Sequence, residues 1–176
     1  MTIKLPYTLD EMKKRGEAAR NDLALALGNF SIRFLQMEDA LNGLIHELLA
    51  LAPDTGHALT SAIHSNRVRF QILGALNNDQ KQADPFRRDV ETALEQAEEL
   101  NEYRNWLLHD RWAGSVAIND QVWNHQKRRM RRGKWQQRDF TSESVAQKAE
   151  ECVEIAQRIS TIRSALYDLR AEGNKG

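Results

Sequence analysis

The stretch VAQKAEECVEIAQRISTIRSALYDL, residues 145–169, carries the clearest structural signal in the chain. Its apolar residues recur at spacings of 3 or 4, the period that places side chains on one face of an amphipathic helix. They are Val145, Ala149, Cys152, Ile155, Ile159, Ile162, Leu166 and Leu169. The segment predicts a long helix, starting near Thr141, that buries one stripe against other helices.

A second long stripe lies near the start of the chain. Thr8 and Glu11 form the pattern of a capping box, which predicts that a helix begins there. The apolar positions of its second half again recur at spacings of 3 and 4, and Pro53 and Gly56 are expected to stop it. They are Phe30, Phe34, Met37, Leu41, Leu44, Leu48 and Leu51. Two further helices are predicted, at about 56–76 and 85–109.

The helical period disappears between about Trp112 and Phe140. SVAI, residues 115–118, is a strand candidate, and two strands flanking RRG are expected to form a hairpin that turns at Gly133. The predicted fold is therefore all-α, a four- to five-helix bundle with a short basic β-hairpin-like insertion before the last helix. We expect an N-terminal helical extension at residues 1–28 and a helical bundle at residues 29–172, which contains the insertion at 112–140. A disordered tail is expected at residues 173–176.

Composition narrows the class of protein. The 176 residues suggest one domain, and 25 basic residues balance 25 acidic ones, so net charge attracts no polyanion. The single cysteine, Cys152, is expected to be a buried apolar residue. No metal-ligand spacing, signal peptide or bilayer-spanning run is present in the sequence, so we expect no cofactor, no metal, no membrane partner and a cytoplasmic protein.

The segment NEYRNWLLHD, residues 101–110, breaks the apolar stripe of its helix. At about 100° per residue, Arg104 lies about 20° from Ala97 and points along the buried stripe. A buried guanidinium needs a carboxylate or a wet cleft, and Glu38 is a candidate partner. His109 lies about 140° further round, so the two side chains serve one site only if the helix end unwinds or if two copies meet in a symmetric dimer.

Arg104 and His109 are also explained by purely structural roles that involve no catalysis. A histidine near a helix C-terminus interacts favourably with the helix dipole, and an arginine on an apolar stripe is often one half of a buried ion pair. Arg67 and Arg69 either line the same cleft or are simply exposed, and exposure is the favoured interpretation.

The segment NEYRNWLLHDRW resembles the R-x(4–6)-H signature of HEPN (higher eukaryote and prokaryote nucleotide-binding) domains, as Arg104, Asn105 and His109. A polar residue after the arginine is usual there, and residues 27–51 and 140–159 resemble the first core helix and the closing helix of that family. Asp110 departs from the pattern, because many members have a small residue after the histidine.

The resemblance implies a metal-independent endoribonuclease that acts as a homodimer with a composite site, of the kind used in toxin or phage-defence systems, with a cognate antitoxin protein as a possible partner. The chemistry suits the residues. Histidine exchanges protons near neutral pH, and arginine holds phosphate oxygens. His109 would move the proton of the attacking 2′-OH, Arg104 would stabilise the phosphorane, and Asn105 would orient the phosphate or the imidazole.

The predicted insertion is strongly basic. Residues 121–138 contain seven basic residues and no acidic one, which predicts a phosphate-binding patch. Trp123 and Trp135 are interleaved with them and could stack unpaired bases, or could pack on the bundle instead. The candidate RNA-binding residues are Lys127, Arg128, Arg129, Arg131, Arg132, Lys134 and Trp135, with Arg138 completing the basic run.

Two other classes of protein fit the sequence. One is a catalytically inactive HEPN-like module that binds RNA, a nucleotide or a protein partner. The other is a structural dimerisation module, suggested by the wide apolar stripe of the first long helix. The basic run favours RNA binding over pure scaffolding, and the pairing of Arg104 with His109 favours catalysis over binding alone.

Overall fold

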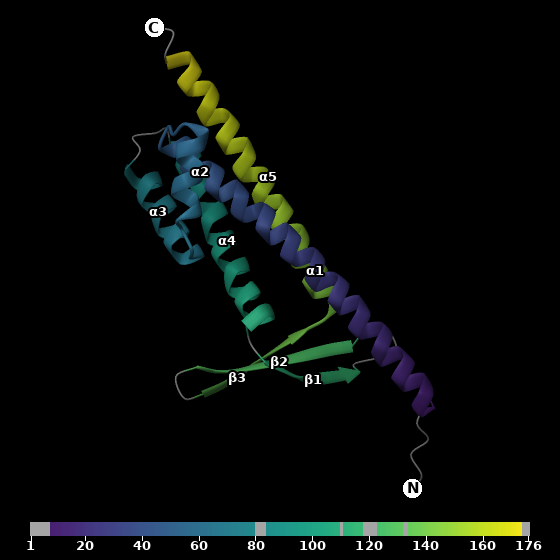
Figure 1. Cartoon of the computed structure of the whole chain (residues 1–176). Coiled ribbons are helices and arrows are strands. Elements are labelled where there is room, and N and C mark those ends of the chain that lie inside the picture. The colour runs from purple at the N-terminus through teal and green to yellow at the C-terminus, as the bar shows by residue number, and fades with distance from the viewer. Residues whose placement is uncertain (1–7, 80–83, 110, 118–122, 132–133, 174–176) are drawn as a thin grey trace. The chain divides into compact units, whose positions relative to one another are not determined.

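The structure is a computed structural model that describes residues 8–79, 84–109, 111–117, 123–131 and 134–173 (Figure 1). The described residues form five helices and one three-stranded sheet, so the predicted helical bundle with a basic hairpin before the last helix is confirmed. The helices are α1 (Leu9–Leu48), α2 (Pro53–Ser61), α3 (Asn66–Asp79), α4 (Asp84–His109) and α5 (Ser142–Gly173), and the strands are β1 (Arg111–Ala117), β2 (Trp123–Arg131) and β3 (Lys134–Phe140).

The chain divides into two compact units. One comprises Met1–Ser31 and Asn105–Ala149 and contains the strands, and we call it the sheet unit. The other comprises Ile32–Arg104 and Glu150–Gly176, and we call it the helical unit. The unit boundaries fall inside α1, α4 and α5, so each of these helices contributes residues to both units.

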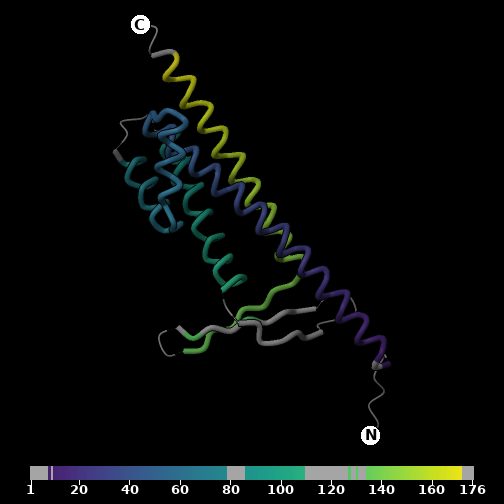
Figure 2. The backbone as a smooth tube through the Cα atoms, in the orientation of Figure 1, coloured from purple at the N-terminus to yellow at the C-terminus, as the bar shows by residue number. Residues whose placement is uncertain are grey.

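The apolar periodicity of the sequence builds the core of the helical unit. In that unit α1 and α5 lie side by side and run parallel (Figure 2), with Arg163 against Gly43 and Arg170 donating to Glu47. Each buried aliphatic side chain contributes about 1.5–3 kcal/mol of hydrophobic free energy. The fully buried residues include Phe34, Met37, Leu41, Leu44 and Ile45 from α1, Leu73 from α3, Ala97 from α4, and Cys152 and Ile159 from α5.

Two predicted helix boundaries are corrected. The single helix expected at 56–76 is two helices, α2 and α3, separated by residues 62–65. Gly56 does not break a helix. It lies inside α2, where a Cβ would collide with the ring of His46. The helix α1 ends at Leu48, and Ala50, two residues later, has a left-handed φ of 51°. The Leu51 N–H donates a hydrogen bond to the His46 carbonyl and so caps the helix end.

The predicted helix starts are confirmed by their hydrogen bonds. Thr8 N–H donates to Glu11 Oε2 at 2.8 Å and Glu11 N–H donates to Thr8 Oγ1 at 3.3 Å, a reciprocal capping box. At the start of α5, Thr141 N–H donates to Ser144 Oγ and Ser144 N–H donates to Thr141 Oγ1. The pKa of the Glu143 carboxyl is lowered, mainly by a hydrogen bond from its own backbone N–H. Burial opposes this effect, and weaker hydrogen bonds from the Thr141 and Ser142 side chains add to the lowering.

The strands form an antiparallel meander in the order β1–β2–β3. Arg131 pairs with Lys134 at the end of the β2–β3 hairpin, which confirms the predicted hairpin, and residues 115–117 of the strand candidate lie in β1. The turn expected at Gly133 and residue Ile118 lie outside the described residues. The register of β1 against β2 shifts between Trp112 and Gly114.

Candidate functional site

The motif helix α4 ends with Arg104, Asn105 and His109 among its last six residues. Within the helical unit, the Arg104 guanidinium lies over the ring of Phe34, with 5.3 Å between Cζ and the ring centroid. Phe34 is almost fully buried, and Arg104 is half-buried. A cation over an aromatic face is attracted by the ring quadrupole, which explains how the apolar stripe accommodates a guanidinium.

Glu38 has a different partner from the one expected. Its carboxylate accepts a hydrogen bond from Asn66 Nδ2 and lies 3.8 Å from Arg69 Nη1, both on α3. The expected pairing of Glu38 with Arg104 is therefore replaced by an ion pair with Arg69, because α3 brings its own guanidinium to that part of α1. Sequence reasoning had no means of placing α3 beside α1.

Arg69 belongs to a part-buried polar cluster that joins three helices of the helical unit. Its Nε donates to Asn42 Oδ1 at 2.7 Å, and Asn66 Nδ2 donates to Asn101 Oδ1 at 3.1 Å. Only 8% of Arg69 is exposed, so its expected exposure is wrong, whereas Arg67 is exposed as expected. The cluster fixes α1, α3 and α4 to one another one turn before Arg104, since Asn101 precedes it on α4.

Asn105 and His109 belong to the sheet unit. Asn105 is half-buried and His109, the last residue of α4, is exposed. Between them, Trp106 and Leu107 are buried. The side chain of His109 is therefore accessible to solvent.

Lys127 is buried rather than available to RNA. Only 1% of the residue is exposed, and its Nζ donates to the backbone carbonyl of Leu107, 20 residues away in sequence. That carbonyl belongs to the last turn of α4, where helix geometry leaves oxygens without intrahelical donors. The expectation that Lys127 binds phosphate is corrected, because its ammonium group is used to cap the helix that carries His109.

A second basic residue contacts the same turn. The Arg138 guanidinium lies over the ring of Trp106, with Cζ 5.9 Å from the centroid, and Phe140 at the end of β3 is buried. One face of the β2–β3 hairpin is therefore joined to the end of α4 by Lys127 and Arg138.

The rest of the basic run is only partly described. Lys134 and Trp135 are exposed, as RNA contact would require, with 69% of Trp135 in solvent. The backbones of Arg128, Arg129 and Arg131 lie in β2 at positions paired with Gln137, Gln136 and Lys134. Arg132 lies outside the described residues. Trp123 is the first residue of β2, where its backbone pairs with Ala117.

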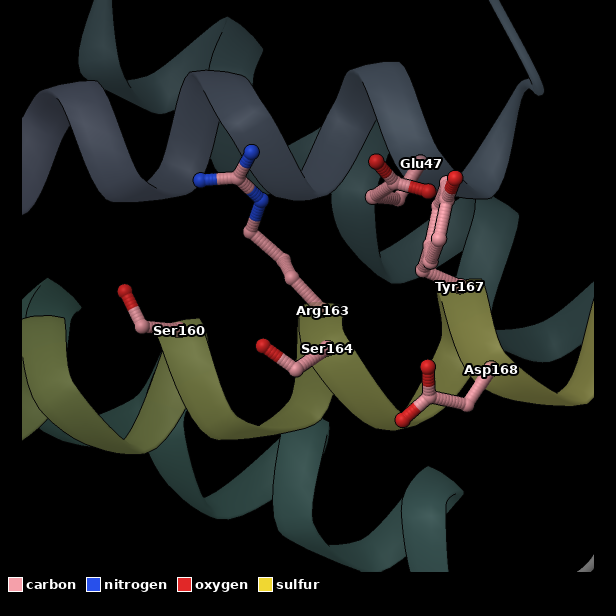
Figure 3. A pocket seen from close by; sticks show the side chains of 6 residues that line it. All are labelled: Glu47, Ser160, Arg163, Ser164, Tyr167 and Asp168. Atoms are coloured by element: carbon pink, nitrogen blue, oxygen red, sulfur yellow. The ribbon is translucent and has the colours of Figure 1, made fainter.

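A groove runs between α1 and α5 in the helical unit, and no motif in the sequence pointed to it. One cavity in it, of about 360 Å³, is lined by Glu47, Ser160, Arg163, Ser164, Tyr167 and Asp168 (Figure 3). Arg163 reaches from α5 toward α1 and lies against Gly43, where any side chain would collide with the guanidinium. Glu47 accepts a hydrogen bond from Arg170. Because the glycine and the arginine fit each other, Gly43 permits the close approach of α1 and α5.

Two absences hold for the residues that the structure describes. Among them, no group of three or more histidine, cysteine, aspartate or glutamate side chains is arranged to hold a metal ion. None of the described helices combines the length and apolarity that crossing a bilayer would need.

Comparisons of the chain with family models, with curated proteins and with solved structures find no match. Its function therefore has to be inferred from its own residues.

Proposed function

We propose that this chain is a metal-independent endoribonuclease of the HEPN type, active as a homodimer. The observation that carries the proposal is the R-N-x-x-x-H pattern in the last turns of α4, with a half-buried Arg104 and Asn105 and an exposed His109. A permanently charged group held against Phe34 and a solvent-accessible titratable group are the two components that cleavage of a ribose phosphate linkage needs.

The proposed reaction uses the 2′-OH of RNA as the nucleophile. His109 removes the 2′ proton as the oxygen attacks the adjacent phosphorus, and Arg104 stabilises the negative phosphorane. The bond from phosphorus to the 5′ oxygen then breaks, and the 5′ oxygen takes a proton from water. The products are a 2′,3′-cyclic phosphate and a free 5′-OH. Asn105 orients the phosphate or the imidazole. Because the nucleophile belongs to the substrate, DNA of the same sequence is not cleaved.

The second copy completes the site. Arg104 and His109 diverge by about 140° on a regular helix, so residues from two α4 helices facing one groove would supply a full set of groups. In a toxin or defence setting, a cognate antitoxin protein that covers this groove would hold the enzyme inactive.

The second candidate is a catalytically inactive RNA-binding module. The exposed Lys134 and Trp135 favour it specifically, because they provide RNA contacts that need no catalytic group. It predicts RNA binding without cleavage.

Cleavage of labelled RNA by the purified full chain, in the presence of a metal chelator, tests the proposal. His109→Ala should lower the rate by about 10²–10⁴-fold and Arg104→Ala by about 10²–10³-fold. The matched controls are His57→Ala and Arg67→Ala, which remove an exposed histidine and an exposed arginine elsewhere. Sedimentation equilibrium should give a dimer.

Equal rates for wild type and His109→Ala, with circular dichroism showing both folded, would refute the nuclease proposal. RNA binding retained by an uncleaving wild type would favour the second candidate. A strictly monomeric active enzyme would refute the composite site alone.

A further inference from the structure

The β2–β3 hairpin has two unlike faces. Side chains alternate along a strand, and residues directly paired across two strands lie on the same face. Trp135 pairs with Met130, and Gln137 pairs with Arg128, so these four positions share one face, which we call the tryptophan face. Lys127, Arg138 and Phe140 lie at positions of the opposite face, which is joined to the end of α4 within the sheet unit.

The tryptophan face exposes apolar side chains that nothing in the described chain covers. Trp135 is 69% exposed and Met130 is 60% exposed. When a flat apolar surface covers two neighbouring large apolar side chains, their removal from water stabilises the contact. The β3 residues on this face, Trp135, Gln137 and Asp139, are all exposed, so the edge strand leaves the tryptophan face open.

The charge of the hairpin as a whole indicates the class of ligand. Residues 121–138 carry seven basic residues and no acidic one. The register places Arg128 on the tryptophan face, whereas Lys134 pairs with Arg131 at a position of the opposite face, at the end of the hairpin where the exposed Trp135 also lies. The nearest carboxylate on the face is Asp139, at the other end of β3, where it accepts a hydrogen bond of 3.4 Å from Gln137. A polyanion with flat apolar rings is the chemistry that complements a cationic strand pair bearing an exposed indole.

We infer that the tryptophan face binds an unpaired segment of RNA by stacking a base on Trp135. The inference rests on the proposed ribonuclease function and deepens it, because it names the form of the substrate as single-stranded. In a duplex, the faces of the bases are covered by their neighbours, so only an unpaired base can lie on the indole. Met130 extends the platform, and the basic residues of the hairpin, with Lys134 at its end, attract the RNA backbone.

Binding is measured with the full chain carrying His109→Ala, so that cleavage does not intervene. The probes are an unstructured fluorescent RNA of about ten nucleotides and the duplex that it forms with its complement. Trp135→Ala should weaken binding of the single strand about tenfold or more, since stacking contributes roughly that factor per base, while duplex binding changes little. Trp135→Phe should restore most of the affinity.

The matched control is Tyr167→Ala, which removes an equally exposed aromatic residue on α5 and should leave the affinity unchanged. Unchanged single-strand binding by Trp135→Ala would overturn the inference, as would equal weakening for single strand and duplex. A change of oligomeric state in Trp135→Ala would also overturn it, by showing that a second copy covers the face.

The outcomes separate this inference from the nuclease proposal. If Trp135→Ala loses single-strand binding but wild type never cleaves, the tryptophan face stands and the nuclease proposal fails. If wild type cleaves RNA and Trp135 has no effect on binding, the nuclease proposal stands and the tryptophan face fails.

Discussion

Strand β3 and helix α5 follow one another in the sequence but differ in how far their side chains are exposed to solvent. Along α5 the residues at spacings of 3 and 4 from Val145 to Leu166 are buried, whereas β3 is exposed at every position except Phe140. Most apolar residues of α5 are therefore accounted for by the core of the protein, but Leu169, the last position of the predicted stripe, is 51% exposed and Tyr167 is 64% exposed. Trp135 in β3 is not part of the core either, so the contrast separates the buried residues that hold the fold from exposed residues that are available to a partner.

The largest expected effect tests whether burial, rather than size, decides stability. Phe34→Ala removes an almost fully buried ring and should lower the free energy of unfolding by about 3–5 kcal/mol. Trp135→Ala removes a larger side chain from the exposed strand and should change it by less than about 0.5 kcal/mol. Chemical denaturation of both variants measures the two values, and a similar loss in both would break the contrast.

A second pair compares two arginines of α3. Arg69→Ala leaves the part-buried Glu38 carboxylate without its cation and should destabilise the chain by about 2–3 kcal/mol, less than a fully buried pair because Asn66 still donates to Glu38. Arg67→Ala, two residues away and exposed, should be neutral within about 0.5 kcal/mol. Thermal unfolding provides the comparison. Loss of stability in Arg67→Ala would mean that exposure is a poor guide in this helix.

A third pair places the same test inside the sheet unit. Lys127→Met keeps the length of the side chain but leaves the Leu107 carbonyl without its donor, which should cost about 1–2 kcal/mol. Lys134→Met, on the exposed part of the hairpin, should have almost no effect on unfolding while weakening RNA binding. If both variants are equally stable, the hairpin is not joined to α4 through Lys127.

The smallest effect depends on pH. The pKa of Glu143 is lowered by hydrogen bonds at the start of α5, so the folded state favours the ionised carboxyl. Its contribution is therefore complete above the ordinary carboxyl pKa and is lost as the pH falls through the lower, folded pKa. Because Glu143 is exposed, Glu143→Gln should cost only a few tenths of a kcal/mol at neutral pH.

Melting temperatures of wild type and Glu143→Gln between neutral pH and pH values below the ordinary carboxyl range check this sign. The two curves should converge in acid. Divergence as the pH falls would show that the charge destabilises the helix start.

The candidate site was only partly accessible to sequence reasoning. The positions of Arg104, Asn105 and His109 at the end of a helix followed from periodicity, because helical phase depends on neighbours three and four residues away. The partner of Glu38 and the burial of Lys127 did not follow, because each depends on a residue 20 or more positions distant in sequence. A basic run has no internal signal that singles out the one lysine whose ammonium reaches a helix carbonyl.

By itself, the amino-acid order determined where the helices and the hairpin lie, since hydrophobic period, caps and loss of period are local properties of the chain. Only the tertiary structure decided which charged residues are buried and which aromatic residues face water. Arg69, Lys127 and Trp135 lie in similarly polar stretches of sequence, yet their solvent exposure is 8%, 1% and 69%. The reason is physical: solvation of a side chain is set by the segments that pack against it, and those segments come from distant parts of the chain.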